Sequence, residues 1–311
     1  MLNIVRRHCR TAVAAAGVAL ALGAGSAHAL SISVTDDPTS LVSALLAPNS
    51  GITVVSGTEA LVLGVEDQQG TFTDFNLSST EPDRPTLSVP DGVVLTTGTA
   101  NFSTELNTVN NFRATTNIGS YQPLVDLAAS GGLSQNQFDS NVLSFDFTVD
   151  NPANNAFIAQ FLFATDEFPT QSVTDIMGIF INGMNVAFFP NGDLVSNQSG
   201  DPNDFFNPNP VGSDGYPIEW NGLTDVFDVV GLINPGQVNT LTLAIADTSD
   251  RIFDSALFFG GLRAGVTAGG GGIGGTVDDD DVLPVSEPAP LALFGLGLGL
   301  LALIRRRRHE A

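Results

Sequence analysis

The sequence predicts an all-β protein, an antiparallel β-sandwich that is jelly-roll-like, with a short N-terminal helix and a separate C-terminal transmembrane helix. Apolar and polar residues alternate along 143–149 and along 157–163, which is the period of strands with one buried face. Asn182 and Gly183 separate two further apolar runs, as the tight turn of a β-hairpin does. Many short runs of this kind, divided by Gly, Asn, Asp and Pro, favour two packed antiparallel sheets.

A helix is expected first, because Asp37 and Pro38 occupy its N-cap and N1 positions and the apolar residues of 41–46 share one helical face. Residues 101–137 are predicted to form a long loop, with or without a helical turn. The Asn- and Pro-rich residues 191–221 are predicted to lie outside the core. Strands are expected at 52–56, 60–65, 70–75, 91–98, 143–149, 157–163, 176–181, 185–189, 226–230, 241–245 and 256–262.

Residues 1–29 have the three parts of a secretory signal peptide. Arginines precede a small-residue apolar run at 11–25, and Ala27-His28-Ala29 forms an A-x-A cleavage site. We therefore expect export through the Sec translocon, cleavage by signal peptidase and a mature protein that begins at Leu30. The alternative, an uncleaved N-terminal anchor, is disfavoured because the apolar run is short and a cleavage site follows it.

Residues 285–311 have the features of a membrane tail. The stretch 289–304 carries no charge and would span about 24 Å as a helix, somewhat less than the roughly 30 Å of a bilayer's hydrocarbon core. Its basic end should stay in the cytoplasm, so the rest of the chain should face outward. A buried core helix is the alternative, but a soluble fold has little use for the four consecutive arginines that follow: Arg305, Arg306, Arg307 and Arg308.

The predicted mature body, 30–285, lacks three reactive residue types. The single cysteine, Cys9, and the three histidines, His8, His28 and His309, lie in the flanking segments, and the chain has no lysine. This composition excludes internal disulfides, Ser-His-Asp or Cys-His nucleophiles and the usual zinc sites. Catalysis in the body would therefore need carboxylates, a hard metal ion or an unusual base.

The body is strongly acidic. Of the 33 acidic residues only Glu287 and Glu310 lie outside it, whereas only four of the 11 basic residues lie inside it. Such a charge repels nucleic acid, so no nucleic-acid partner is expected. The length suits one domain at 30–266, followed by a Gly- and Asp-rich linker at 267–284 and then the tail.

Six acidic residues form the candidate functional site, because all are predicted to lie at strand ends or in adjacent loops. Ca²⁺ takes six to eight oxygen ligands, which such side chains can supply, although their spacing does not match an EF-hand. In the alternative interpretation the acids cap turns, accept backbone N–H bonds or pair with Arg251. The candidate calcium ligands are Asp166, Glu167, Asp175, Asp247, Asp250 and Asp254.

A pair of these carboxylates is also compatible with glycoside hydrolysis. Asp166 with Asp247 or Asp254 is geometrically possible, whereas adjacent Asp166 and Glu167 would point to opposite faces of a strand. One tryptophan and two tyrosines offer little aromatic surface for sugar binding. Catalysis is therefore the less favoured hypothesis.

The tail resembles the PEP-CTERM sorting signal of Gram-negative bacteria. Its motif is Val285, Ser286, Glu287 and Pro288, followed by the apolar run and the arginines. The resemblance implies recognition by an exosortase-type membrane enzyme that removes the tail. Ser286 stands where that family has its first proline, so processing is less well supported than membrane targeting.

The body resembles the choice-of-anchor L family, which implies a class of surface protein and no particular reaction. Asn221 stands where the family often has aspartate, so the resemblance assigns no acidic role to position 221 of this chain. The two resemblances imply a protein tethered to the inner membrane during sorting and then placed at the cell surface or in the extracellular matrix. The matching segments of the body are 41–46, 92–98, 163–169, 175–180, 245–250 and 253–256.

We therefore expect an exported, non-enzymatic protein that acts in adhesion or in biofilm and exopolysaccharide structure. Its partners would be exopolysaccharide or surface proteins. The alternative is a carboxylate- or Ca²⁺-dependent hydrolase acting on exopolysaccharide. The two hypotheses differ in whether replacing Asp166 and Asp247 abolishes turnover.

Overall fold

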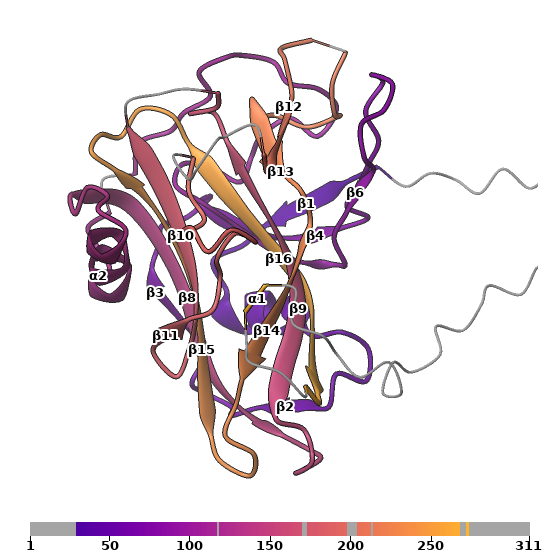
Figure 1. Ribbon diagram of the computed structural model, residues 1–311, viewed down its shortest axis with the longest axis vertical. Helices are drawn as coiled ribbons and strands as arrows, with labels where there is room; N and C mark the ends of the chain where they lie inside the picture. The colour runs from indigo at the N-terminus through magenta and orange to yellow at the C-terminus, as the bar shows by residue number, and fades with distance from the viewer. Residues whose placement is uncertain are drawn as a thin grey trace, which may run out of the picture.

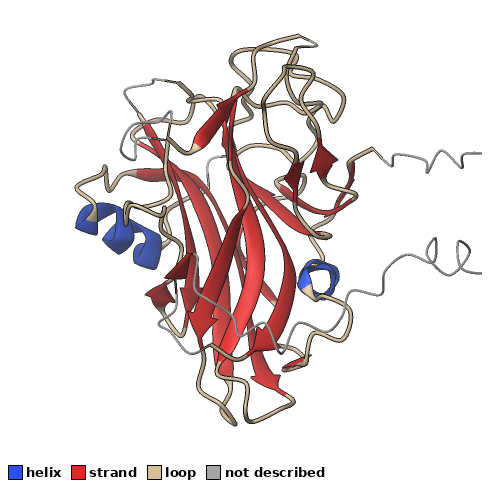
Figure 2. Cartoon of the chain, turned by 45° about the vertical axis from the view of Figure 1, so that its right-hand side comes forward, coloured by secondary structure: helices blue, strands red, loops and turns tan. Residues whose placement is uncertain are grey.

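A computed structural model describes residues 29–116, 118–169, 173–197, 204–212, 214–267 and 272–273. Two antiparallel sheets form the framework of this part of the chain, and only two helices accompany them there (Figures 1 and 2). The predicted membrane helix 289–304, its basic end and nearly all of the predicted signal peptide lie outside these residues. Within them, neither helix has the length and apolarity needed to cross a bilayer.

The larger sheet has nine strands, and all its pairings are antiparallel. Two of its strands branch from the main order: β14 (Phe227–Leu232) pairs with β9, and β17 (Gly272–Ile273) pairs with β14. β17 falls within the stretch predicted as a linker. The main order is β1 (Ser31–Val34), β4 (Gln69–Thr73), β7 (Gly92–Thr96), β16 (Ser255–Gly265), β9 (Ala156–Thr165), β13 (Gly222–Thr224) and β12 (Phe206–Pro208).

The smaller sheet has six strands, and a separate hairpin is formed by β5 (Asn76–Leu77) and β6 (Leu87–Ser88). β3 (Ala60–Leu63) pairs with β8 beside the main order. That order is β11 (Met184–Asn185), β10 (Thr174–Ile181), β15 (Asn239–Thr248), β8 (Gln137–Val149) and β2 (Ile52–Val54).

The main core lies between the two sheets, as alternation along the strands predicts. Phe145 and Phe147 of β8 contribute to the same apolar cluster as Phe161 and Phe163 of β9, and all four are at most 1% exposed. The chain crosses between the sheets from β8 to β9 and from β15 to β16. The predicted all-β antiparallel sandwich is therefore confirmed, while the finer jelly-roll description stays a prediction.

The first helix, α1 (Pro38–Leu45), begins where its capping signal predicts. The Asp37 carboxylate accepts hydrogen bonds from the backbone N–H groups of Thr39 at 3.4 Å and Ser40 at 3.1 Å. The helix buries Leu41, Val42 and Leu45 against the main core, because these three residues lie on one helical face.

The predicted hairpin at Asn182 and Gly183 is also confirmed. Both residues have positive φ, 51° and 83°, as the tight turn between paired strands requires, and Ile181 pairs with Met184 across it. The following strand, β11, is shorter than the predicted 185–189.

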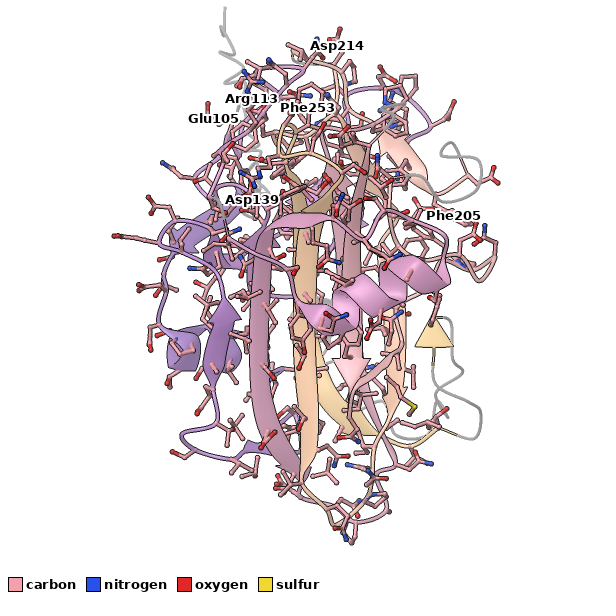
Figure 3. The ribbon with its side chains drawn as sticks, turned by 90° about the vertical axis from the view of Figure 1, so that its left-hand side faces the viewer. Glu105, Arg113, Asp139, Phe205, Asp214 and Phe253 are labelled. Carbon is pink, nitrogen blue, oxygen red and sulfur yellow. The ribbon has the colours of Figure 1, made fainter. Side chains whose placement is uncertain are left out.

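A second helix, α2 (Gln122–Ser130), replaces much of the loop predicted at 101–137. Leu124 and Ala128 pack on Ile176, Phe180 and neighbouring side chains of the smaller sheet, on the face away from the main core. Figure 3 shows this helix lying across the long strands. The sequence gives little indication of α2, because only Leu124 and Ala128 of the helix are buried and Tyr121 provides no side-chain cap.

The prediction that 191–221 lies outside the core is wrong. Tyr216, Ile218 and Trp220 are at most 1% exposed and belong to a second apolar cluster on the outer face of the larger sheet. Trp220 packs edge-on against Phe102 and Phe112, with ring centroids 5.2 and 5.3 Å apart. The polar composition is tolerated because buried Asn side chains bond the loop's own carbonyl groups, as shown below.

Candidate functional site

The space between the two sheets changes from apolar to polar at one end of the sandwich. On β9 the inward-facing positions run Phe161, Phe163, Thr165, and the same alternation extended past the strand reaches Glu167. The other long strands show the same change at the same end. The polar residues that continue their inward-facing series are Asn141 on β8, Asp175 on β10, Asp247 on β15, Ser255 on β16 and Thr97 after β7, each at most 1% exposed.

Antiparallel pairing brings two of the predicted acids together. Asp175 and Asp247 lie directly opposite each other in the register of β10 and β15. Opposed residues of an antiparallel pair place their Cβ atoms about 5 Å apart on one face of the sheet. The sheet therefore holds two carboxylates side by side, with both residues at most 1% exposed.

Asp254 approaches this pair from the larger sheet. It directly precedes β16, and its backbone carbonyl accepts a hydrogen bond from the Asp166 N–H at 3.0 Å. Its carboxylate lies against Gly98: a Cβ atom added there would be 1.8 Å from Asp254 Oδ2. A glycine at position 98 is therefore what leaves room for this carboxylate.

Three of the predicted acids have no hydrogen-bond donor within the described part of the chain. Both carboxylate oxygens of Glu167, Asp247 and Asp254 lack a partner with hydrogen-bond geometry, although each residue is only 1% exposed. The nearest polar groups, Thr97 beside Asp247 and the Ala114 N–H beside Asp254, only partly offset the rise in pKa that burial causes. Buried polar groups are normally hydrogen-bonded, and a buried charge needs a compensating partner. Six unsatisfied oxygens at one end of the sandwich are therefore the most unusual feature of this protein.

Burial raises the pKa of each acid in this group, and the neighbouring carboxylates raise it further. The pKa of Glu167 and that of Asp254 rise to about 9, and the pKa of Asp175 rises to about 8, even though its Oδ2 accepts a hydrogen bond from Ser255. The pKa of Asp247 also lies well above its usual value, through burial and then the charge of Asp175. Burial therefore favours the protonated form of each of these acids in the absence of a cation.

Asp166 and Asp250 belong to a different class. Asp166 accepts hydrogen bonds from the N–H of Asn221 at 2.9 Å and that of Phe112 at 2.5 Å, which partly offset the burial that raises its pKa to about 7. Asp250 accepts a bond from the N–H of Ile252 within its own loop. For these two residues the turn-capping interpretation describes the structure.

The predicted pairing with Arg251 does not supply the missing donors. Its guanidinium lies over the ring of Phe138, 4.4 Å from the centroid. The oxygens of Asp247 and Asp254 accept no hydrogen bond in the described part of the chain. Neither acid is therefore satisfied by the arginine.

Sequence reasoning missed two contributors to the polar end. Asp139 has φ of 49° at an irregular step in the pairing of β8 with β15, and its charge raises the pKa of both Asp247 and Asp254. Asn141 donates to the carbonyl groups of Gln68 and Thr96. Both residues precede the apolar alternation of 143–149, so extending that period toward the N-terminus would have found Asn141.

A further buried acid, Glu219, was also missed, and it is fully satisfied. Its carboxylate accepts three hydrogen bonds: two from the N–H groups of Thr108 and Val109 and one from the Thr108 hydroxyl. This contrast shows that the fold can compensate a buried carboxylate where no cation is needed. No motif in the sequence distinguishes Glu219 from the acids of the polar end.

Metal-binding geometry is not preformed. Within the described ranges, no group of three or more His, Cys, Asp or Glu side chains is placed closely enough to hold a metal ion. Because the body contains neither His nor Cys, its side-chain metal ligands would be carboxylate, amide and hydroxyl oxygens. These are ligands for hard cations.

Two cavities of about 500 Å³ lie elsewhere on the described surface. The first is adjacent to the polar end and is lined by Arg84, Asn110, Phe168, Pro169, Pro208, Asn209, Pro210 and Asn221. The second lies between the C-terminal end of α1 and the Pro90–Asp91 turn. None of the six predicted acids lines either of them.

Asn221 connects the first cavity to the polar end. Its side-chain amide donates to the carbonyl groups of Asp166 at 3.1 Å and Asn110 at 3.2 Å. An aspartate at this position could not donate these bonds. The departure from the family pattern at position 221 therefore has a local structural role.

Comparison with known proteins supports the resemblance found in the body. The model of the choice-of-anchor L domain matches residues 31–262, which cover most of the chain and include every long strand except the end of β16. No curated protein and no solved structure matches the chain. Membership in this family indicates an exported or cell-surface-associated protein. The chain belongs to the choice-of-anchor L domain family.

Proposed function

We propose that this protein is a non-enzymatic adhesion module that binds exopolysaccharide at the cell surface. Family membership supports a surface location. The cavity lined by Asn110, Asn221, Phe168 and Arg84 is the observation that carries the binding role, because it combines amide and guanidinium groups with an apolar wall. Sugars are recognised by this combination of polar hydrogen-bonding groups and apolar surface.

The tail would deliver the module to its place of action. Its sequence supports transient tethering through 289–304, recognition of the motif 285–288 by an exosortase-type enzyme, and release to the surface or matrix. The intact mass of protein from the envelope fraction tests this step. A chain that ends near Val285 supports removal of the tail, whereas a chain that retains Arg305–Arg308 contradicts it.

The competing function is a hydrolase acting on the same polymer. The pKa of Asp166, about 7, would suit a general acid. Against this, both oxygens of Asp166 accept backbone hydrogen bonds, and Asp166, Asp247 and Asp254 are at most 1% exposed. A glycosidase must present two carboxylates to one substrate, so these features favour binding over turnover.

The binding role is tested with the exported protein and exopolysaccharide purified from the producing organism. Asn110→Ala removes an exposed amide beside the cavity, and we expect a loss of affinity of about 2- to 10-fold. Asn234→Ala, in the exposed β14–β15 turn at the opposite end of the sandwich, is the matched control. Equal binding by both variants would contradict the assignment of this cavity.

An assay for reducing ends, carried out on the same protein and exopolysaccharide, distinguishes binding from hydrolysis. New reducing ends released by the wild-type protein, and lost in both Asp166→Asn and Asp247→Asn, would establish the hydrolase and reject the proposal. Binding without release of reducing ends is the expected result.

A further inference from the structure

We propose that the polar end of the space between the sheets is a buried calcium site, with Asp175, Asp247 and Asp254 as its protein ligands and Asp139 beside them. The site does not depend on exopolysaccharide binding, since its residues do not line the neighbouring cavity. Four observations support it. Acidic residues of both sheets come together at this end, and some of their oxygens lack hydrogen-bond donors. The available side chains are ligands for hard cations, and the lack of a side chain at Gly98 leaves room for the Asp254 carboxylate.

Convergence is imposed by the fold. Asp175 and Asp247 are an opposed pair on the smaller sheet, and Asp254 directly precedes β16 of the larger sheet. The two sheets are connected at this point, because the hydroxyl of Ser255 donates to Asp175 Oδ2 at 2.5 Å. The carboxylates of Asp175, Asp247 and Asp254 therefore lie near one another at this end of the sandwich, as the effect of the Asp175 charge on the pKa of the other two also indicates.

The carboxylate oxygens that lack hydrogen-bond donors indicate what kind of partner this end of the sandwich should bind. Asp247 and Asp254 are 1% exposed and all four of their oxygens lack hydrogen-bond partners among the described residues. Glu219 and Asp166, which are equally buried, are each satisfied by backbone N–H groups. Burial alone therefore does not leave a carboxylate unpaired in this fold, and a cation is the partner that several adjacent carboxylates can share.

Ligand chemistry selects calcium among the common cations. The body offers neither His nor Cys, which disfavours zinc and copper. Mg²⁺ requires a near-ideal octahedron and usually keeps several waters, whereas Ca²⁺ accepts an irregular set of six to eight oxygens. The side-chain oxygen of Asn141 lies beside Gly64, so Asn141 is not included in the proposed ligand set.

The carboxylates do not yet converge on a single point. Rotation about their side-chain bonds would be needed to complete the site, and calcium binding would displace the protons that burial favours on these acids. Glu167 is another buried acid at this end of the sandwich: the charge of Asp175 raises its pKa, but neither Asp247 nor Asp254 is among the principal causes. We therefore do not count Glu167 among the calcium ligands, and the variant Glu167→Gln tests this exclusion.

The experiment measures thermal unfolding of the exported protein after removal of divalent ions with a chelator. Adding CaCl₂ to about 10 mM should raise the Tm by about 3–10 °C, given dissociation constants of roughly 0.1–1 mM for extracellular calcium modules. Isothermal titration should give one Ca²⁺ per chain. MgCl₂ at equal ionic strength should raise the Tm by less than half as much.

Three substitutions locate the site. Asp247→Asn and Asp254→Asn should abolish the calcium-dependent rise in Tm and leave the chelated protein at least as stable as wild type, because each removes a buried acid that has no donor. Gly98→Ala keeps every carboxylate but places a Cβ against Asp254 Oδ2, so it should reduce the calcium response at least threefold. Glu167→Gln should retain most of the response.

Asp228→Asn, which changes an exposed aspartate on β14, is the matched control and should behave as wild type. An unchanged Tm of the wild-type protein up to 10 mM CaCl₂ would overturn the proposal. Equal shifts with calcium and magnesium, or an undiminished calcium response in Asp247→Asn, would also overturn it. Exopolysaccharide binding is measured separately, so a failure here leaves the adhesion proposal standing.

Discussion

The hydroxyl of Ser255 donates a hydrogen bond of 2.5 Å to Oδ2 of Asp175. The two residues belong to different sheets, β16 and β10, and both are at most 1% exposed. Together with the bonds from Asn141 to the carbonyl groups of Gln68 and Thr96, this bond holds the polar end of one sheet against that of the other. It also orients the acid that most strongly affects its neighbours, since Asp175 raises the pKa of Glu167, Asp247 and Asp254.

Ser255→Ala should therefore destabilise the protein. The substitution leaves one oxygen of a buried carboxyl group without its donor, which costs about 1–3 kcal/mol of unfolding free energy. Urea denaturation at neutral pH measures the loss. Ser33→Ala, in an exposed position of β1, is the control and should change the unfolding free energy by less than about 0.5 kcal/mol. Similar stabilities for the two variants would show that the bond between the sheets contributes little.

In the presence of a chelator, stability should fall as pH rises. The pKa of Asp254 is about 9 in the folded protein, far above that of an unfolded aspartate, so the folded state holds a proton that the unfolded state has lost. Its contribution is fully present below pH 4 and is lost as pH rises toward 9, at a rate on the order of 1 kcal/mol per pH unit.

Unfolding midpoints recorded between pH 5.5 and 9 measure this dependence. Asp254→Asn carries no ionisable group at that position and should show a smaller slope than wild type. A wild-type stability that stays constant, or increases, over this range would contradict the raised pKa of the buried acids.

The strand framework was predictable because its signals are local. The period of two along β8 and β9, the Asp37-Pro38 helix start and the Asn182-Gly183 turn each depend on neighbouring residues alone. Strands β1, β5, β6, β12, β13 and β17 were missed because two to four residues show too little alternation to be recognised. β2 and β3 are as short but were predicted, because each lies in a longer run of apolar or β-branched residues. The order of the strands within each sheet depends on long-range pairing, which a single sequence does not reveal.

The candidate site was predictable only in part. All six predicted acids occur near one end of the sandwich, because antiparallel strands that alternate in direction place strand ends and strand starts together. Which acids are satisfied depends on backbone N–H groups from distant loops, such as those of Phe112 and Asn221 that bond Asp166. Burial separates Asp247 from Asp250, although the two lie only three residues apart.

The N-cap of α1 offers a test at an exposed position. Hydrogen bonds from Ser40 and Thr39 lower the pKa of Asp37, so its stabilising effect is present above the unfolded pKa, near 4, and is lost as pH falls through the folded value. Asp37→Ala should lower the Tm slightly at pH 7 and less at pH 3. Asp37→Asn preserves a good cap and should be closer to wild type at pH 7, and Asp36→Ala is the exposed control. A loss in Asp37→Ala that is equal at both pH values would contradict the role of the ionised carboxylate.

The buried Asn network under Trp220 offers the sharpest test of the region that sequence reasoning placed outside the core. The Asn209 side chain donates to the carbonyl groups of Ile218 and Trp220 and accepts from the Tyr216 N–H at 2.7 Å. Asn209→Ala removes the partner of the Tyr216 N–H and of the Ile218 carbonyl, whereas the Trp220 carbonyl keeps a hydrogen bond from Asn107 at 3.3 Å. We expect a loss on the order of 2–4 kcal/mol if the loop stays folded. Trp220 is the only tryptophan, so its fluorescence reports on this loop directly. The emission of the variant should shift to the red at urea concentrations that leave the sheets folded.

Gly215→Ala should have a similar effect without altering the amide, because a Cβ there would lie 1.9 Å from Asn209 Oδ1. Gly119→Ala is the matched control, since a Cβ at that glycine meets no atom within 4 Å. If Gly215→Ala and Gly119→Ala gave the same emission maximum and the same midpoint, the network would not be what holds Trp220 in place. A red shift in Gly215→Ala and Asn209→Ala alone would show that buried amide groups, rather than apolar sequence pattern, fold this part of the chain into the core.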